Sequence, residues 1–127
     1  MNNTEKILVV DDVALMRDLL IRELTSLGFT DIQHASCGED ALKIIQMGGF
    51  SMVMLDINMP GMSGLKILQM VREIDANIFT VMVSAHSSAE NVKQAVKSGA
   101  NGFIVKPYTM KKITEVIGKY RNARCPA

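Results

Sequence analysis

The sequence is poor in cysteine and has no long hydrophobic run. Its two cysteines, Cys37 and Cys125, lie far apart and form neither a CxxC motif nor a Cys/His pattern. This spacing excludes a disulfide framework and a cysteine zinc site, so we expect reduced thiols in a cytoplasmic protein. The polar segment Met1–Lys6 does not resemble a signal peptide, and no apolar stretch approaches the roughly 20 residues of a membrane span. We therefore expect no membrane insertion.

The sequence also lacks an excess of charge of either sign. Lysine and arginine number 14 and aspartate and glutamate 13, which gives a net charge of +1. Because no overall basic field attracts a polyanion, we expect no direct contact with nucleic acid and recognition of protein partners through a local patch. The 127 residues, 48% of them hydrophobic, are enough for one domain with one core. We predict a single domain over residues 1–127.

Apolar runs and amphipathic segments alternate five times, which is typical of a parallel sheet with helices on both faces. The runs predict five strands: Lys6–Val10, Asp31–Ala35, Met52–Leu55, Phe79–Val83 and Gly102–Val105. Helical periodicity predicts a helix after each strand, and helix ends or caps are expected at Gly28, Gly48-Gly49, Ser88, Gly99 and Thr109. The predicted fold is α/β: a five-stranded, doubly wound parallel sheet with five helices.

Three carboxylates stand where predicted strands end. Asp11 and Asp12 directly follow the first strand, and Asp56 directly follows the third. Ligands of parallel sheets bind beyond the carboxyl ends of the strands, so these acids point to a site. Two carboxylates about 5 Å apart repel by roughly 3 kcal/mol at an effective dielectric constant of about 20, so the cluster needs a cation. Oxygen ligands favour Mg²⁺, with Mn²⁺ as the other choice, over zinc, and the chain has only two histidines.

Two further polar residues follow predicted strands: Ser84 the fourth and Lys106 the fifth. A lone serine there commonly caps a helix, and a lone lysine is commonly a solvated charge. Occurring together with the three acids, they indicate a common site at the carboxyl edge of the sheet. Four of the five predicted strands thus end in a charged or hydroxyl side chain.

In this arrangement the chain resembles the receiver domain of two-component response regulators, most closely the single-domain chemotaxis regulators. The resemblance covers Lys6 to about Tyr120, and its motifs are Asp11-Asp12, Asp56-Ile57-Asn58-Met59-Pro60-Gly61-Met62-Ser63-Gly64, Ser84-Ala85 and Lys106-Pro107. It implies a flavodoxin-like sheet with strand order 2-1-3-4-5.

The resemblance also implies roles for the site residues. Asp56 would accept a phosphoryl group from a phosphohistidine of a sensor histidine kinase or a phosphotransfer protein. Mg²⁺ would be bound by Asp12, by Asp56 and by the backbone carbonyl of Asn58, with Asp11 acting through a metal-bound water. Lys106 would pair with the phosphoryl oxygens, and Ser84 would donate its hydroxyl to one of them. An acyl phosphate adds about −1.5 to −2 of charge, which a metal and a lysine can balance.

The expected output is a switched surface and not enzymatic turnover, apart from slow loss of the phosphoryl group. By the resemblance, Ser84 moves toward the phosphoryl group and lets the ring of Phe103 turn inward. The downstream target would bind the face of the fourth helix, fifth strand and fifth helix. Asn58 and His86 are expected at the rim of the site, on the path of a hydrolytic water. We expect the protein to be a monomer.

Two other classes of protein share features with this chain, and one variant of the receiver prediction remains. An aspartate-nucleophile phosphatase also combines aspartates, Mg²⁺ and lysine, but the haloacid-dehalogenase type needs Asp-x-Asp after the first strand, where this chain has adjacent acids. Flavin binding is disfavoured because the loop 11–14 lacks the hydroxyl and glycine residues that hold a phosphate, and its acids repel one. A receiver domain detached from a larger regulator is the remaining alternative.

Overall fold

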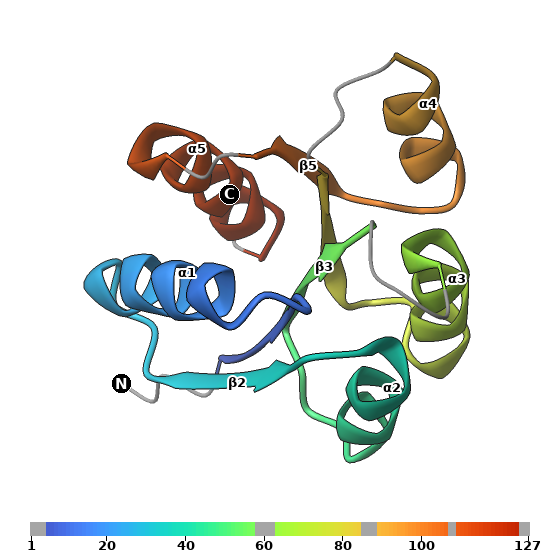
Figure 1. Ribbon diagram of the computed structural model, residues 1–127, viewed down its shortest axis with the longest axis horizontal. Coiled ribbons are helices and arrows are strands. Elements are labelled where there is room, and N and C mark those ends of the chain that lie inside the picture. The colour runs from blue at the N-terminus through green and yellow to red at the C-terminus, as the bar shows by residue number, and fades with distance from the viewer. Residues whose placement is uncertain (1–4, 58–62, 85–88, 107–108, 125–127) are drawn as a thin grey trace.

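The computed structural model describes residues 5–57, 63–84, 89–106 and 109–124 (Figure 1). Strands and helices alternate along the chain: β1 Lys6–Val10, α1 Ala14–Ser26, β2 Asp31–Ala35, α2 Gly38–Gln46, β3 Met52–Asp56, α3 Gly64–Ile74, β4 Phe79–Ser84, α4 Ala89–Lys97, β5 Gly102–Val105 and α5 Met110–Arg124. This order confirms the predicted alternation of strand and helix. No helix in these ranges is long and apolar enough to cross a membrane.

The five strands form one parallel sheet in the order β2-β1-β3-β4-β5, as predicted. Because β2 and β3 lie on opposite sides of β1, the winding direction reverses between β1 and β3. In open parallel sheets the crevice for a ligand forms at this reversal, beyond the carboxyl ends of the strands. The topology therefore places the end of β1 beside the end of β3, which carry the three predicted acids.

Helices cover both faces of the sheet: α1 and α5 one face, α2, α3 and α4 the other (Figure 1). Residues of β1 alternate between two cores, since Ile7 and Val9 pack with α1 and α5 whereas Leu8 and Val10 pack with α2 and α3. A strand that is buried on both faces must be apolar at every position. This explains why the strands could be read in the sequence as continuous apolar runs.

Two strands extend one residue further than predicted, because the hydrogen-bonded ladder continues through a polar residue. Asp56 pairs in register with Val83, and Ser84 pairs with Val105. The amide of Lys106 donates to the carbonyl of Ser84 at 2.8 Å. Asp56 and Ser84 are therefore the last residues of β3 and β4, so that the sheet itself fixes the backbone of both.

Most of the predicted helix limits are confirmed. Glycines with positive φ follow three of the helices: Gly28 at 102°, Gly48 at 86°, Gly49 at 85° and Gly99 at 102°. The hydroxyl of Thr109 accepts a hydrogen bond from the amide of Lys112 at 3.2 Å, as expected of an N-terminal cap. The other predicted cap, Ser88, lies outside the described residues.

Candidate functional site

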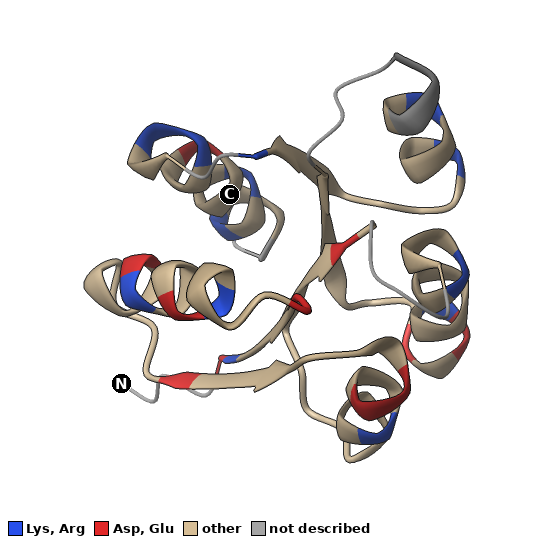
Figure 2. Ribbon diagram, viewed as in Figure 1, with Lys and Arg blue, Asp and Glu red and all other residues tan. Residues whose placement is uncertain are grey.

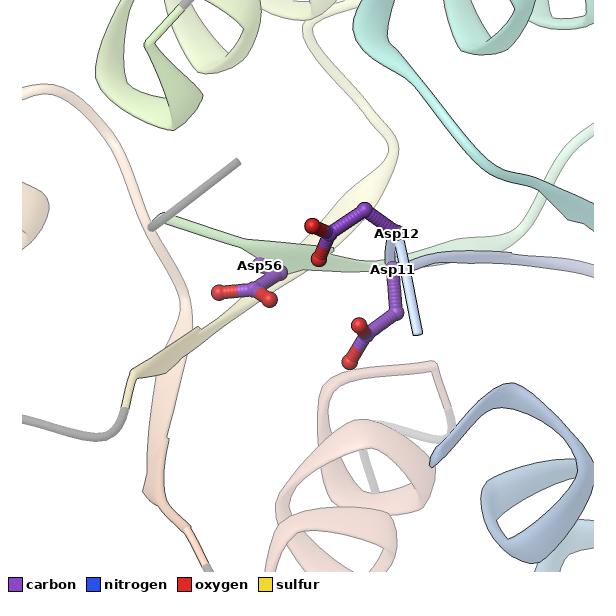
Figure 3. Close-up of side chains that lie close together, drawn as sticks. All are labelled: Asp11, Asp12 and Asp56. Atoms are coloured by element: carbon purple, nitrogen blue, oxygen red, sulfur yellow. The ribbon is translucent and has the colours of Figure 1, made fainter. Parts of the chain in front are cut away.

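Asp11, Asp12 and Asp56 meet where β1 and β3 end, as Figure 3 shows. One carboxylate oxygen of each lies within 4.8 Å of the others. Asp11 and Asp56 are buried, with 1% and 2% of their surfaces exposed, whereas Asp12 is exposed. The structure thus brings the three predicted acids together and opens the cluster to solvent on the side of Asp12.

Lys106, directly after β5, joins the cluster with a side chain that is 17% exposed. Its Nζ lies 3.0 Å from Oδ2 of Asp56 and 3.0 Å from Oδ2 of Asp11. Burial lowers the pKa of Lys106, but hydrogen bonds to Asp56 and Asp11 and the charges of both carboxylates outweigh burial, so that this pKa is raised above the ordinary 10.5. Lys106 therefore remains an ammonium ion throughout the neutral range.

The main chain also holds Asp11 in place. Its Oδ1 accepts a hydrogen bond from the amide of Val13 at 2.9 Å, and its carbonyl accepts one from Nη1 of Arg17 at 2.7 Å. Sequence reasoning missed Arg17, because an arginine in the first turns of a helix ordinarily projects into solvent. The one signal in the sequence is that Arg17 lies six residues after Asp11, close enough for its long side chain to reach back to the start of the helix.

The residues of the cluster fit a divalent cation. Three carboxylates and one ammonium leave two negative charges, which one Mg²⁺ ion neutralises. Oδ2 of Asp11 is buried and lies 3.0 Å from Nζ of Lys106. A carboxylate oxygen has more than one lone pair, so Oδ2 can face Lys106 and still approach a metal or a metal-bound water. All the donors are oxygens, which suits Mg²⁺ or Mn²⁺.

The start of α3 lies directly against the end of β3. The amide of Gly64 donates to the carbonyl of Ile57 at 3.3 Å. A Cβ atom at Gly64 would lie 2.5 Å from Cα of Ile57 and 2.7 Å from the carbonyl oxygen of Asp56, both of them backbone atoms. Only glycine allows this approach, so Gly64 helps to fix the backbone that carries Asp56.

The other predicted site residues lie at different distances from the acids. Ser84 is fully buried at the end of β4, and its carbonyl pairs with the amide of Lys106. Phe103 is half-buried on β5, three residues before Lys106 and thus about 10 Å along the strand, so it stands outside the acid cluster. Asn58 and His86 lie outside the described residues.

The chain is similar to known proteins over most of its length. The model of the family described as the response regulator receiver domain matches residues 7–118. Chemotaxis protein CheY-3 of Vibrio cholerae is 36% identical over 121 residues, which cover 94% of this chain and 93% of that protein.

Two solved structures resemble the whole domain. A CheY-like response regulator receiver domain protein from Methanospirillum hungatei superposes with a TM-score of 0.87 at 25% identity, covering 94% of this chain and 95% of its own. The CheX-CheY-BeF3-Mg²⁺ complex from Borrelia burgdorferi contains a chain with a TM-score of 0.84 at 34% identity, covering 89% and 86% respectively.

Proposed function

Because the chain belongs to the family of response regulator receiver domains, we propose that it is the phosphoacceptor of a two-component signalling system. Asp56 takes the phosphoryl group from a phosphohistidine on a sensor histidine kinase or a phosphotransfer protein. The observation that supports this most strongly is the setting of Asp56: a buried carboxylate that is 3.0 Å from the ammonium of Lys106 and lies in one cluster with the carboxylates of Asp11 and Asp12.

In the transfer, a carboxylate oxygen of Asp56 attacks phosphorus, and the bond from phosphorus to the imidazole nitrogen breaks. The electron pair of that bond returns to the nitrogen, which takes up a proton. Lys106 pairs with the oxygens of the transferred phosphoryl group, because its Nζ already lies 3.0 Å from Oδ2 of Asp56. Ser84 donates its hydroxyl to the same group, since the strand end that carries it pairs with Lys106. Lys106 balances the negative charge that accumulates on the phosphoryl oxygens, and the hydroxyl of Ser84 stabilises it by a hydrogen bond.

Mg²⁺, or Mn²⁺ in its place, supplies positive charge beside the phosphoryl group when it is bound. Asp12, Asp56 and the carbonyl of Asn58 would hold it directly and Asp11 through a water. The exposure of Asp12 gives the ion a way in from solvent. The protein acts as a switch and not as a turnover enzyme, and the phosphoryl group leaves slowly by hydrolysis, with Asn58 and His86 at the rim of the site.

The output is a change of partner-binding surface. Ser84 and Phe103 form the switch, and the downstream target binds the face made by α4, β5 and α5. The position of Phe103, half-buried on the edge strand β5, supports this choice because a ring there can exchange surface with core. We propose that the chain acts as a single receiver domain, in monomeric form, in the cytoplasm.

Intact mass measurement after incubation with acetyl phosphate and Mg²⁺ tests the proposal. The expected result is one added phosphoryl group that is lost in base and that requires the metal. Asp56→Asn should abolish it, whereas Asp31→Asn, a matched change at the exposed start of β2, should not. Equal labelling of Asp56→Asn would overturn the assignment of the phosphoacceptor.

A further inference from the structure

A pocket of about 390 Å³ lies at the carboxyl end of the edge strand β2, and we call it the β2-edge pocket. Its lining includes Arg17 of α1, Ala35 at the end of β2, and Asp40, Lys43 and Ile44 of α2. Because α1 and α2 cover opposite faces of the sheet, the pocket forms around the end of β2 (Figure 1). None of the three acids of the cluster lines it, so it is a separate cavity.

Two hydrogen bonds of Asp11 join the β2-edge pocket to the acid cluster. The amide of Asp11 donates to the carbonyl of Ala35 at 3.2 Å, and the carbonyl of Asp11 accepts from Nη1 of Arg17 at 2.7 Å. One wall of the pocket therefore contacts the turn that carries Asp11 and Asp12. A group that binds Arg17 in the pocket thus lies near the acid cluster without entering it.

The pocket carries two positive charges and one negative charge. Among the residues that the structure describes, both salt bridges belong to Lys106, so Arg17, Asp40 and Lys43 are without an ionic partner there. The half-buried side chain of Arg17 makes one hydrogen bond to a described residue, through Nη1 to Asp11. A guanidinium has five N–H donors in a planar set, so most of those of Arg17 are available to a ligand.

These groups favour a ligand with a single negative charge. A guanidinium binds a carboxylate by two parallel hydrogen bonds, and Lys43 adds a second positive charge. Asp40 opposes a ligand with more charge, such as a phosphate monoester. Ala35 and Ile44 supply apolar surface. Since a cavity of about 150 Å³ holds benzene, the pocket has room for a substituted ring.

We propose that the β2-edge pocket binds a small organic monocarboxylate. The carboxylate lies on Arg17 and Lys43, and the apolar body of the ligand packs against Ala35 and Ile44. Binding requires neither Mg²⁺ nor a phosphoryl group, because none of these four residues belongs to the acid cluster.

Arg17 links the pocket to the acid cluster. Its positive charge, held against the carbonyl of Asp11, opposes the binding of a cation there. A carboxylate on Arg17 neutralises that charge, so the carboxylate and Mg²⁺ each strengthen the binding of the other, and this linkage is reciprocal. The linkage rests on the proposed function, which places Mg²⁺ at the cluster, whereas the pocket assignment does not.

NMR titration of ¹⁵N-labelled protein with 4-methylbenzoate in EDTA tests the pocket assignment. The amides of residues 34–44 should shift in a saturable manner, with a dissociation constant on the order of 1 mM. The uncharged analogue 4-methylbenzamide should bind at least about fivefold more weakly. The phosphate monoester 4-methylphenyl phosphate should bind at least about threefold more weakly, and Asp40→Asn should reduce this discrimination.

Two variants and a control locate the ligand. Arg17→Gln and Lys43→Gln should each weaken binding of 4-methylbenzoate at least about threefold. Lys43 is exposed, so its replacement should leave the fold intact. Lys66→Gln, the same change at an exposed site on α3, should alter the affinity less than 1.5-fold, which is about the error of such a titration. Equal affinity for the benzoate and the benzamide, or unchanged affinity in Arg17→Gln and Lys43→Gln, would overturn the pocket assignment.

Repeating the titration with Mg²⁺ at about ten times its dissociation constant tests the linkage. The affinity for 4-methylbenzoate should rise about twofold in the unmodified protein and by less in Arg17→Gln. Amides of residues 10–13 report the binding of Mg²⁺ in the same spectra. Bound Mg²⁺ with an equal effect in both proteins, or with none in either, would overturn the linkage. Failure of Mg²⁺ to bind at all would tell against the proposed function and leave the pocket assignment intact.

Discussion

Among single residues, Lys106 has the largest electrostatic effect on the site, because its ammonium is the cation that the described residues place between Asp11 and Asp56. The raised pKa of Lys106 means that its positive charge stabilises the fold. A lysine whose pKa is higher in the folded than in the unfolded state stabilises the fold fully below its ordinary pKa of 10.5, and this stabilisation is lost as the pH rises through the raised value.

Lys106→Met should therefore lower the free energy of unfolding in EDTA by about 3 kcal/mol, because it leaves two buried carboxylates without their cation. Added Mg²⁺ should recover much of the loss. Urea unfolding measures both effects, with Lys43→Met as a control on an exposed lysine of α2. Between about pH 7 and 9 the difference from the unmodified protein should stay constant, and it should shrink only at strongly alkaline pH. A loss of the same size in EDTA and in Mg²⁺ would contradict this account.

Gly64 allows a second prediction with a matched control. Gly64→Ala should destabilise the fold by about 2 to 3 kcal/mol, since its Cβ would lie 2.5 Å from backbone of Ile57. It should also slow phosphorylation by acetyl phosphate, because Asp56 lies on the displaced backbone. Gly118→Ala, where no atom lies within 4 Å of the new Cβ, should be neutral or stabilise α5 by up to about 1 kcal/mol. Chemical denaturation of both variants is the measurement; similar losses would contradict the packing argument.

Residues at strand ends could be predicted from the sequence, and residues that act through long side chains could not. Asp11, Asp12, Asp56 and Lys106 each follow or close an apolar run, and the parallel sheet then brings the ends of the runs together. The contact of Arg17 with the carbonyl of Asp11 depends on the path of a flexible side chain. Hydrophobic periodicity carries no information about the path of such a side chain.

At the level of elements, one side chain connects α3 to the loop before β5. Nε of Arg72 donates to the carbonyl of Gly99 at 3.0 Å, and Nη1 donates to the carbonyl of Ala76 at 3.0 Å and to that of Ile78. Nη2 donates to Oδ1 of Asn101, which also accepts from the amide of Thr80. Burial lowers the pKa of Arg72, and the charge of Asp75 opposes this. The guanidinium thus fixes the amino edge of β4 and β5.

Arg72→Lys should cost about 2 kcal/mol of unfolding free energy, because an ammonium lacks the planar set of donors that reaches three carbonyls on two loops. Arg22→Lys on the exposed side of α1 should change stability by less than about 0.5 kcal/mol. Hydrogen exchange should show faster opening at the amide of Asn101, which donates to the carbonyl of Thr80. Unchanged exchange there, with lower global stability, would show that Arg72 does not hold this loop.

The central strands could be predicted from the sequence because a strand buried on both faces is apolar at every position, so that it appears as a continuous apolar run. The edge strands are weaker signals: β2 has one buried residue in five, and β5 one in four. Their order in the sheet cannot be read from periodicity, which carries no information about neighbours. The order came from the resemblance, and the observed register confirms it.

In the molecule as a whole, negative charge is concentrated at the carboxyl edge of a well-packed sheet. Both cores are apolar and tightly buried, whereas the cluster of three acids retains two negative charges after Lys106 is counted. Residues 1–88 carry a formal charge of −5 and residues 89–127 one of +6, and Figure 2 shows basic residues on α4 and α5 and most acids on the other elements. Sequence reasoning missed this division of charge because the total of +1 averages the two parts, although counting charge segment by segment reveals it.

The acid cluster should therefore make the metal-free protein less stable than its core allows. Asp12→Asn, a change at the exposed member, should raise the free energy of unfolding in EDTA by about 1 kcal/mol by removing repulsion from Asp11 and Asp56. With Mg²⁺ at ten times its dissociation constant, the unmodified protein should gain about 1.4 kcal/mol. The variant should gain much less, since it has lost a ligand, so the order of stability is expected to reverse. Thermal unfolding of both proteins in EDTA and in Mg²⁺ measures this, and equal gains from Mg²⁺ would show that Asp12 does not bind the ion.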